Sequence, residues 1–133
     1  MSAYSEFTIA EFKDKALLLA ALKAMGFCPV ENAVMSDYWG EYKGKAPNAD
    51  IVIPKSQLKN SYDDIGFRRD ANGNYSAVIG DMDSSRGFNS SWLDLIKGNY
   101  LEAGVIRQAK AIGLIPVSRK VNNGKVTLVY QRA

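Results

Sequence analysis

Carboxylates are the residues of this chain best suited to chemistry, and two close pairs of them are the first candidates. In AVIGDMDSS an apolar run is followed by Asp81 and Asp83, whereas Asp63 and Asp64 stand side by side just ahead of Ile65. Paired carboxylates can share a proton and act as acid and base, or they can hold a divalent cation. Both pairs are therefore candidates for a catalytic or metal-binding site.

The Asp81 pair also resembles the aspartyl-nucleophile loop of haloacid-dehalogenase phosphotransferases. In that family a parallel sheet carries the loop, but this chain lacks the βαβ alternation that builds such a sheet. An EF-hand does not fit either, because Gly87 comes one place late and the twelfth position is Trp92. We therefore predict a polar loop from Asp81 to Asn89 that caps the next helix, with a Mg²⁺ site as the alternative.

Asp63 and Asp64 are predicted to be structural. Adjacent residues of a strand point to opposite faces of the sheet, so the two carboxylates are not expected to converge. We predict that both side chains are exposed to solvent where the strand at Ile65 begins.

The chain of 133 residues contains no histidine and one cysteine, Cys28. These counts exclude Ser-His-Asp and Cys-His catalysis, imidazole zinc sites and an internal disulfide. We expect no cofactor and no metal, and Cys28 as a small buried hydrophobe. The N-terminal MSAYSEFTIAEFKDK lacks the features of a signal peptide, and no apolar run is long enough to span a bilayer, so we predict a cytoplasmic protein.

An aromatic-basic cluster is the strongest candidate for a binding surface. Aromatic rings with interleaved cations suit single-stranded nucleic acid, because bases stack on the rings and the cations neutralise phosphates. The net charge of +3 permits such a partner without requiring it. Two arginines across a hairpin would share the same sheet face, so the predicted nucleic-acid-binding residues are Tyr38, Trp39, Tyr42, Lys43, Lys45, Arg68 and Arg69. The alternative is that Trp39 is a core residue of an amphipathic strand.

Three further cations, Arg119, Lys120 and Lys125, lie near the C-terminal end of the chain. They would either extend this basic face or protect an edge strand from aggregation.

The first half of the chain predicts a strand, a helix and then several strands. Residues 5–12 alternate between apolar and polar side chains. Residues 15–25 have the apolar spacing of a helix, with Asp14 as its N-cap and Gly26 at its end. Further strands are expected over residues 27–34 and 51–53, and on both sides of the Asn72-Gly73 turn.

The second half predicts a long helix and a hairpin. Residues 91–112 are helical in pattern, with Asn89 or Ser90 as the cap and Gly113 at the end. Strands over residues 114–121 and 125–132 flank a turn at Asn123-Gly124. The predicted inner stripe of the helix is Leu93, Ile96, Tyr100, Ala103 and Ile106.

These elements predict one α+β domain over residues 1–133. The expected fold is a single, mostly antiparallel sheet with two helices packed on one face, in the order β-α-β-β-β-β-α-β-β. LKAMGFCPV and AKAIGLIPV share Lys, Ala, Gly, Pro and Val at the same places. We interpret them as equivalent helix-to-strand units on one sheet, related by a possible pseudo-twofold. Convergence on a common helix ending is the alternative.

Several stretches together resemble an uncharacterised family. They are SAYSEFTIAEFKD, LLLAALKAMGF followed by ENA, ADIVI, YDDIGFRRDANGNYSAVIGD and WLDLIKGNYLEAGVIRQAKAIG. The family is a conserved hypothetical plastid reading frame of algae, shared with cyanobacteria, other bacteria and some phages, and known as a domain of unknown function. Its members commonly begin Met-Ser-His-aromatic, whereas this chain has Ala3, so no role for that histidine carries over. The resemblance implies no catalytic residues, and its gene neighbourhoods imply an accessory role beside an AAA-type ATPase.

The sequence thus predicts a non-enzymatic binding module. The leading hypothesis is a protein that binds RNA or single-stranded DNA through the aromatic-basic face. The alternative is a protein adaptor or accessory subunit, with an AAA-type ATPase as the suggested partner. An exposed apolar patch or an open sheet edge would favour this alternative.

Overall fold

The structure, a computed structural model, describes residues 4–8, 12–35 and 48–132. The chain separates into two compact units, Met1–Tyr100 and Leu101–Ala133, which we call the N-terminal and C-terminal units. The protein is α+β, as the sequence predicts, and its elements follow the predicted order with short helices added between them.

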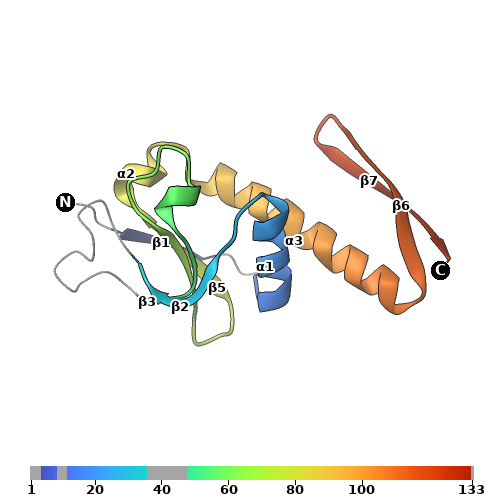
Figure 1. Ribbon diagram of the computed structural model, residues 1–133, viewed down its shortest axis with the longest axis horizontal. Helices are drawn as coiled ribbons and strands as arrows, with labels where there is room; N and C mark the ends of the chain where they lie inside the picture. Colours follow the sequence, from blue (N-terminus) through green and yellow to red (C-terminus); the bar gives the residue numbers. More distant parts are fainter. Residues whose placement is uncertain (1–3, 9–11, 36–47, 133) are drawn as a thin grey trace. The chain divides into compact units, whose positions relative to one another are not determined.

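A five-stranded antiparallel sheet forms the N-terminal unit (Figure 1). Its strand order is β1-β5-β4-β3-β2, so β2 to β5 form a meander and β1 joins its far edge. The Asp70 carboxylate closes the turn between β4 and β5 by accepting the N–H groups of Asn72 and Asn74 at 2.9 and 3.0 Å. The strands are β1 (Tyr4–Thr8), β2 (Val30–Val34), β3 (Asn48–Ile53), β4 (Ile65–Arg69) and β5 (Tyr75–Gly80).

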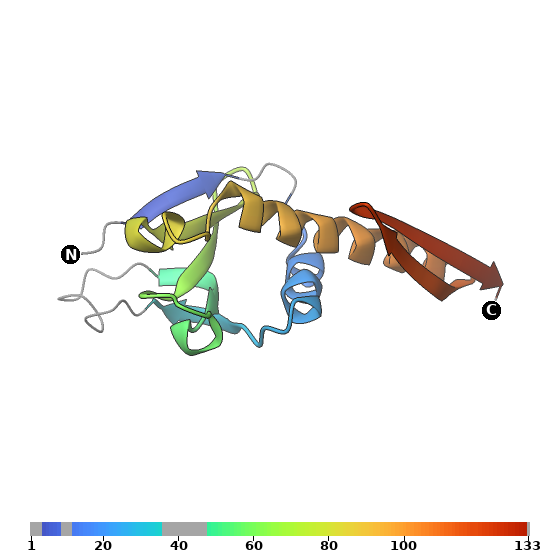
Figure 2. The same cartoon turned by 90° about the horizontal axis from the view of Figure 1, so that it is seen from above.

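Two helices cover one face of this sheet, α1 (Lys15–Ala24) and the first part of α3 (Ser90–Ala111). Figure 2 shows α1 beside α3. The inward-facing apolar residues of the strands pack against the apolar stripes of both helices, which confirms the prediction that both helices pack on one face. The core between them contains Leu18, Ala21 and Leu22 of α1, Leu93, Ile96 and Tyr100 of α3, and Ile51, Ile53, Ile65, Phe67, Ala77 and Ile79 of the sheet. The predicted stripe of α3 ends there, because Ala103 and Ile106 are only partly buried.

The helix ends follow the predicted capping residues. Asp14 Oδ1 accepts the N–H of Leu17 at 3.1 Å, and Asn89 Oδ1 accepts the N–H of Ser91 at 3.0 Å. Gly26 and Gly113 end the two helices with φ of +92° and +82°, which side chains other than glycine rarely adopt. The local chemistry of the repeated stretches is therefore the same.

The opposite sheet face carries a smaller apolar cluster of Met35, Ala49, Val52 and Val78. Gly66 lets β4 approach this cluster closely. A Cβ at Gly66 would lie 2.5 Å from Met35 Sδ and 2.8 Å from Ala49 Cβ. Glycine is thus required at this position by packing rather than by its dihedral angles.

The C-terminal unit contains the rest of α3 and a hairpin of β6 (Leu114–Asn122) and β7 (Lys125–Arg132). The turn uses left-handed Asn123 and Gly124, with φ of 51° and 76°. These two strands form a sheet of their own, so the prediction of a single sheet was wrong. Alternation predicts a strand but not its partner, and β6 and β7 pair with each other through their local turn. The pseudo-twofold on one sheet was wrong for the same reason, since β2 and β6 belong to different sheets.

Candidate functional site

The Asp83 carboxylate holds the loop before β4 in place. Its Oδ1 accepts the N–H of Tyr62 at 2.8 Å, and its Oδ2 accepts the N–H of Asp63 at 3.0 Å and the Ser61 hydroxyl at 2.9 Å. The side chain is fully buried at the short helix α2 (Asp81–Ser84), which directly follows β5. Residues 81–84 are thus helical, whereas the sequence predicted a polar loop over this stretch. The carboxylate satisfies loop donors that would otherwise be buried without acceptors.

Asp63 and Asp64 are both buried, at 0% and 7% exposure, so the predicted solvated start of the strand was wrong. Asp64 Oδ1 accepts the N–H of Lys55 at 2.7 Å, at the start of a 3-10 turn (Lys55–Gln57). Asp63 packs against β5 so closely that a Cβ at Gly80 would collide with its Oδ2. Alternation alone cannot reveal this burial, because it comes from the loop folding over the end of β5.

The described residues contain no cluster of three or more His, Cys, Asp or Glu side chains suited to hold a metal ion. The same part of the chain has no helix with the length and apolar character needed to cross a membrane.

Cys28 is exposed, in contrast to the predicted buried position. It lies between α1 and β2, where Gln57 binds its backbone rather than its thiol. Gln57 Oε1 accepts the N–H of Cys28 at 2.7 Å, and Gln57 Nε2 donates to its carbonyl at 2.8 Å. Gln57 thus holds the backbone of Cys28 in place, and the thiol remains exposed.

An open groove of about 520 Å³ lies where β2, β3 and β4 run side by side. It combines two cations with amide and aliphatic side chains and one carboxylate. Val34 and Asn48 face each other across the β2–β3 pair at its rim. The lining residues are Asn32, Val34, Asn48, Ala49, Asp50, Arg68 and Arg69.

Arg68 and Arg69 are the two predicted site residues that the structure describes, and both line this groove. Arg68 Nε donates to the carbonyl of Asn48 at 3.1 Å. The guanidinium carbon of Arg69 lies 5.7 Å from the centre of the Tyr75 ring, within cation–π distance. Asp50 Oδ2 accepts the backbone N–H of Arg69 at 2.7 Å, which ties β3 to the end of β4.

The other predicted site residues, Tyr38, Trp39, Tyr42, Lys43 and Lys45, lie outside the described residues. In the sequence they lie between β2 and β3. Val34, the last residue of β2, and Asn48, the first residue of β3, both line the groove. Sequence reasoning missed Asn32, Asn48 and Asp50. These three residues come together only through the pairing of the strands, which the sequence does not reveal. The single local signal was Asn32, an asparagine within a strand pattern, and its left-handed φ of 51° explains why asparagine stands there.

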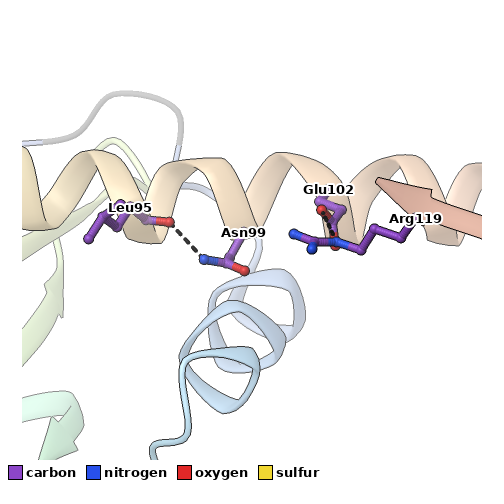
Figure 3. Close-up of polar contacts among 4 residues, drawn as sticks. All are labelled: Leu95, Asn99, Glu102 and Arg119. Carbon is purple, nitrogen blue, oxygen red and sulfur yellow. Dashed lines mark hydrogen bonds and ion pairs between the residues drawn. The ribbon is translucent and has the colours of Figure 1, made fainter. Parts of the chain in front are cut away.

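The predicted hairpin cations have different surroundings. Arg119 pairs with Glu102 of α3, its Nε lying 3.0 and 3.1 Å from the two carboxylate oxygens (Figure 3). Lys120 and Lys125 are exposed. One turn earlier in α3, Asn99 Nδ2 donates to the Leu95 carbonyl at 2.9 Å (Figure 3). Arg119 thus fixes the hairpin to its own helix, and only the two lysines remain as candidates for a basic face or for edge protection.

The N-terminal unit is therefore an antiparallel α+β sheet domain with an arginine-lined groove at its β2–β3–β4 edge. The chain belongs to the protein family of unknown function DUF1257, whose sequence profile matches residues 21–129. This match confirms the resemblance to an uncharacterised family that the sequence motifs indicated. No curated protein and no solved structure matches the chain.

Proposed function

We propose that this protein is a non-enzymatic module that binds single-stranded nucleic acid at the groove between β2, β3 and β4. The observation that carries the proposal is that Arg68 and Arg69 line one open groove together with Asn32 and Asn48. Guanidinium groups pair with phosphate oxygens, and amide side chains exchange hydrogen bonds with base edges. The groove supplies both kinds of contact.

The sequence supplies aromatic residues that could stack on bases. Tyr38, Trp39 and Tyr42 lie between β2 and β3 in the sequence, and Lys43 and Lys45 follow them with two positive charges. Aromatic side chains combined with cations bind single strands without strong sequence preference.

The carboxylates support a non-enzymatic role. Asp83 accepts three hydrogen bonds from the loop at 61–63, and Asp64 accepts one from Lys55. Both carboxylates are engaged in holding the fold.

Fluorescence anisotropy with single-stranded RNA, single-stranded DNA and duplex DNA across a salt series tests the proposal. Single strands are expected to bind best, with log K falling by roughly 0.7 per log unit of salt for each phosphate neutralised. Arg68→Gln/Arg69→Gln should weaken binding and flatten this slope, as should Lys43→Gln/Lys45→Gln. Arg86→Gln is the matched control, because Arg86 is an exposed arginine that contacts Tyr62 away from the groove. No binding at low salt, or equal losses in all three variants, would refute the groove as the site.

A second candidate function, a protein adaptor, is favoured by a different observation. Exposed large aliphatic side chains concentrate in the C-terminal unit, whereas the groove lies in the N-terminal unit. The suggestion of an AAA-type ATPase as partner rests on the family resemblance alone. Co-purification with such an ATPase that changes with its nucleotide state would support it.

A further inference from the structure

The C-terminal unit exposes an unusual amount of apolar surface for its size. It carries eight of the twelve exposed large hydrophobic residues among those that the structure describes, namely Leu101, Val105, Ile112, Ile115, Val117, Val121, Val126 and Val129. Ala109 is the one buried hydrophobic residue in the described part of this unit. A two-stranded hairpin without a core is marginally stable in water. Exposed apolar surface of this kind marks an interaction site.

The same unit is strongly basic. It contains six cations, Arg107, Lys110, Arg119, Lys120, Lys125 and Arg132, against a single acid, Glu102. Its formal net charge is therefore +5, so the N-terminal unit must carry −2 for the chain to total +3. A complementary partner is acidic.

Both faces of the hairpin carry exposed valines. Val121 and Val126 pair across the strands and so lie on the same face, at 58% and 41% exposure. Val129 lies three positions beyond Val126 along β7, hence on the opposite face, and is 46% exposed. Arg119 lies two positions before Val121 on β6, hence on the Val121 face, and it pairs with Glu102 of α3. The face that a partner would cover is therefore the one that carries Val129.

The two outer edges of the hairpin differ. β6 contains Pro116, which has no N–H, and its register shifts between Pro116 and Ser118. Proline and bulges block strand addition. β7 is continuous from Lys125 to Arg132 and, within the described sheets, pairs with β6 alone. Strand β7 is therefore the edge at which a partner strand could add.

We propose that the hairpin β6–β7 docks into an acidic protein partner, in an apolar groove rimmed by carboxylates that covers the Val129 face of the hairpin and the β7 edge. The inference rests on the adaptor function and is independent of nucleic-acid binding at the N-terminal groove. A second copy of this chain is a poor occupant. Two C-terminal units would bring +5 against +5, and the described part of the N-terminal unit offers four exposed large hydrophobic residues, Val30, Val34, Met82 and Leu95.

Site-specific photo-cross-linking of the full-length protein tests the docking surface. A benzophenone side chain replaces Val129 in one version and Val30 in the other, since these strand valines are 46% and 47% exposed. Native lysate is irradiated with nuclease present, and the cross-linked protein is identified by mass spectrometry and purified. Cross-linking at position 129 and its absence at position 30 is the expected result.

Binding of the purified partner is then measured with matched variants. Val129→Thr keeps the branched shape but replaces one methyl group with a hydroxyl, and it should raise Kd at least tenfold, whereas Val30→Thr should change Kd less than twofold. Lys120→Gln/Lys125→Gln should slow association and reduce its salt dependence. If a partner binds both threonine variants equally, the adaptor function survives but this surface is wrong. If no protein cross-links at either position, both fail.

Other occupants would give different products. A cross-linked homodimer would overturn the proposal in favour of self-association. A product that forms only when nuclease is omitted would overturn it in favour of nucleic acid. Binding to phosphatidylserine vesicles that Val129→Thr abolishes would overturn it in favour of a membrane. Protection of Val129 from carbene footprinting in the free monomer would show that the chain covers this surface itself, and would also overturn it.

Discussion

The phenolic oxygen of Tyr100 accepts the backbone N–H of Asp14, which lies 86 positions earlier in the chain, at 3.0 Å. The same oxygen accepts the N–H of Lys13 at 3.2 Å, and the Tyr100 ring lies 5.0 Å from that of Phe12. Asp14 is the N-cap of α1, so one side chain of α3 positions the start of the other core helix. A buried aromatic ring with a hydrogen-bonded polar tip is how tyrosine commonly serves a core.

Tyr100→Phe should destabilise the protein although it keeps the ring. Two backbone N–H groups lose their acceptor, and each partly buried donor left unsatisfied costs about 1 kcal/mol or more, so we expect a loss of about 2 kcal/mol. Urea unfolding measures the difference. Tyr62→Phe is the control, because the Tyr62 hydroxyl contacts Arg86 at the exposed surface, and it should change stability by less than about 0.5 kcal/mol. Equal effects of both substitutions would show that Tyr100 does not position α1.

Asp83→Asn should destabilise the N-terminal unit strongly. The carboxylate accepts three hydrogen bonds, whereas an amide offers one oxygen and directs N–H groups at the remaining donors. We expect a loss of about 3 kcal/mol by urea unfolding. Asp94→Asn, at an exposed position of α3, is the control and should be near neutral. Thermal unfolding of the parent with and without Mg²⁺ adds a second readout. A rise with Mg²⁺ that Asp83→Asn removes would instead support the metal site considered from the sequence.

Two glycine-to-alanine substitutions should have opposite signs. At Gly66 the new Cβ would lie 2.8 Å from Ala49 Cβ, and the strand must shift, so we expect a loss of about 2 kcal/mol. At Gly98, inside α3, a Cβ meets nothing within 4 Å, and alanine should stabilise the protein by about 1 kcal/mol. Chemical denaturation of both variants measures the signs. A stable Gly66→Ala variant would show that the β4 face is not tightly packed.

The ion pair between Lys15 and Glu31 links α1 to β2. The side-chain hydrogen bond to Glu31 raises the pKa of Lys15. Because the folded-state pKa is raised, the stabilisation is present below the unfolded lysine pKa of about 10.4 and disappears as the pH rises through the folded value. NMR titration of Lys15 should show this raised pKa, and Glu31→Gln should lower it. A Lys15 pKa that is insensitive to Glu31→Gln would contradict the pairing.

Local signals in the sequence predicted much of the fold. Asp14 and Asn89 were recognisable as caps because their side chains suit helix starts. Gly26 and Gly113 were recognisable as helix ends, and the turns at Asn72-Gly73 and Asn123-Gly124 were recognisable because these residues tolerate positive φ. Each of these features depends on a few neighbouring residues.

The errors arose where the answer depended on distant residues. The burial of Asp63 depends on Asp83 and Gly80, and the separation of β6 and β7 from the main sheet depends on which edges find partners. The groove residues Asn32 and Asn48 come together only through the pairing of β2 with β3. Arg68 and Arg69 were predictable as candidates because of their charge, but their contacts with Asn48 and Tyr75 were not.

The placement of β1 beside β5 has a consequence for the order of events during synthesis. Strands β2 to β5 pair with their neighbours in sequence and can assemble soon after each leaves the ribosome. β1 emerges before all of them, yet Tyr4 must wait for Gly80 to be made before it can pair. Of these five strands, the one translated earliest is thus the last to join the sheet. Until it does, the nascent chain presents the open side of β5 to every other chain on the same polysome.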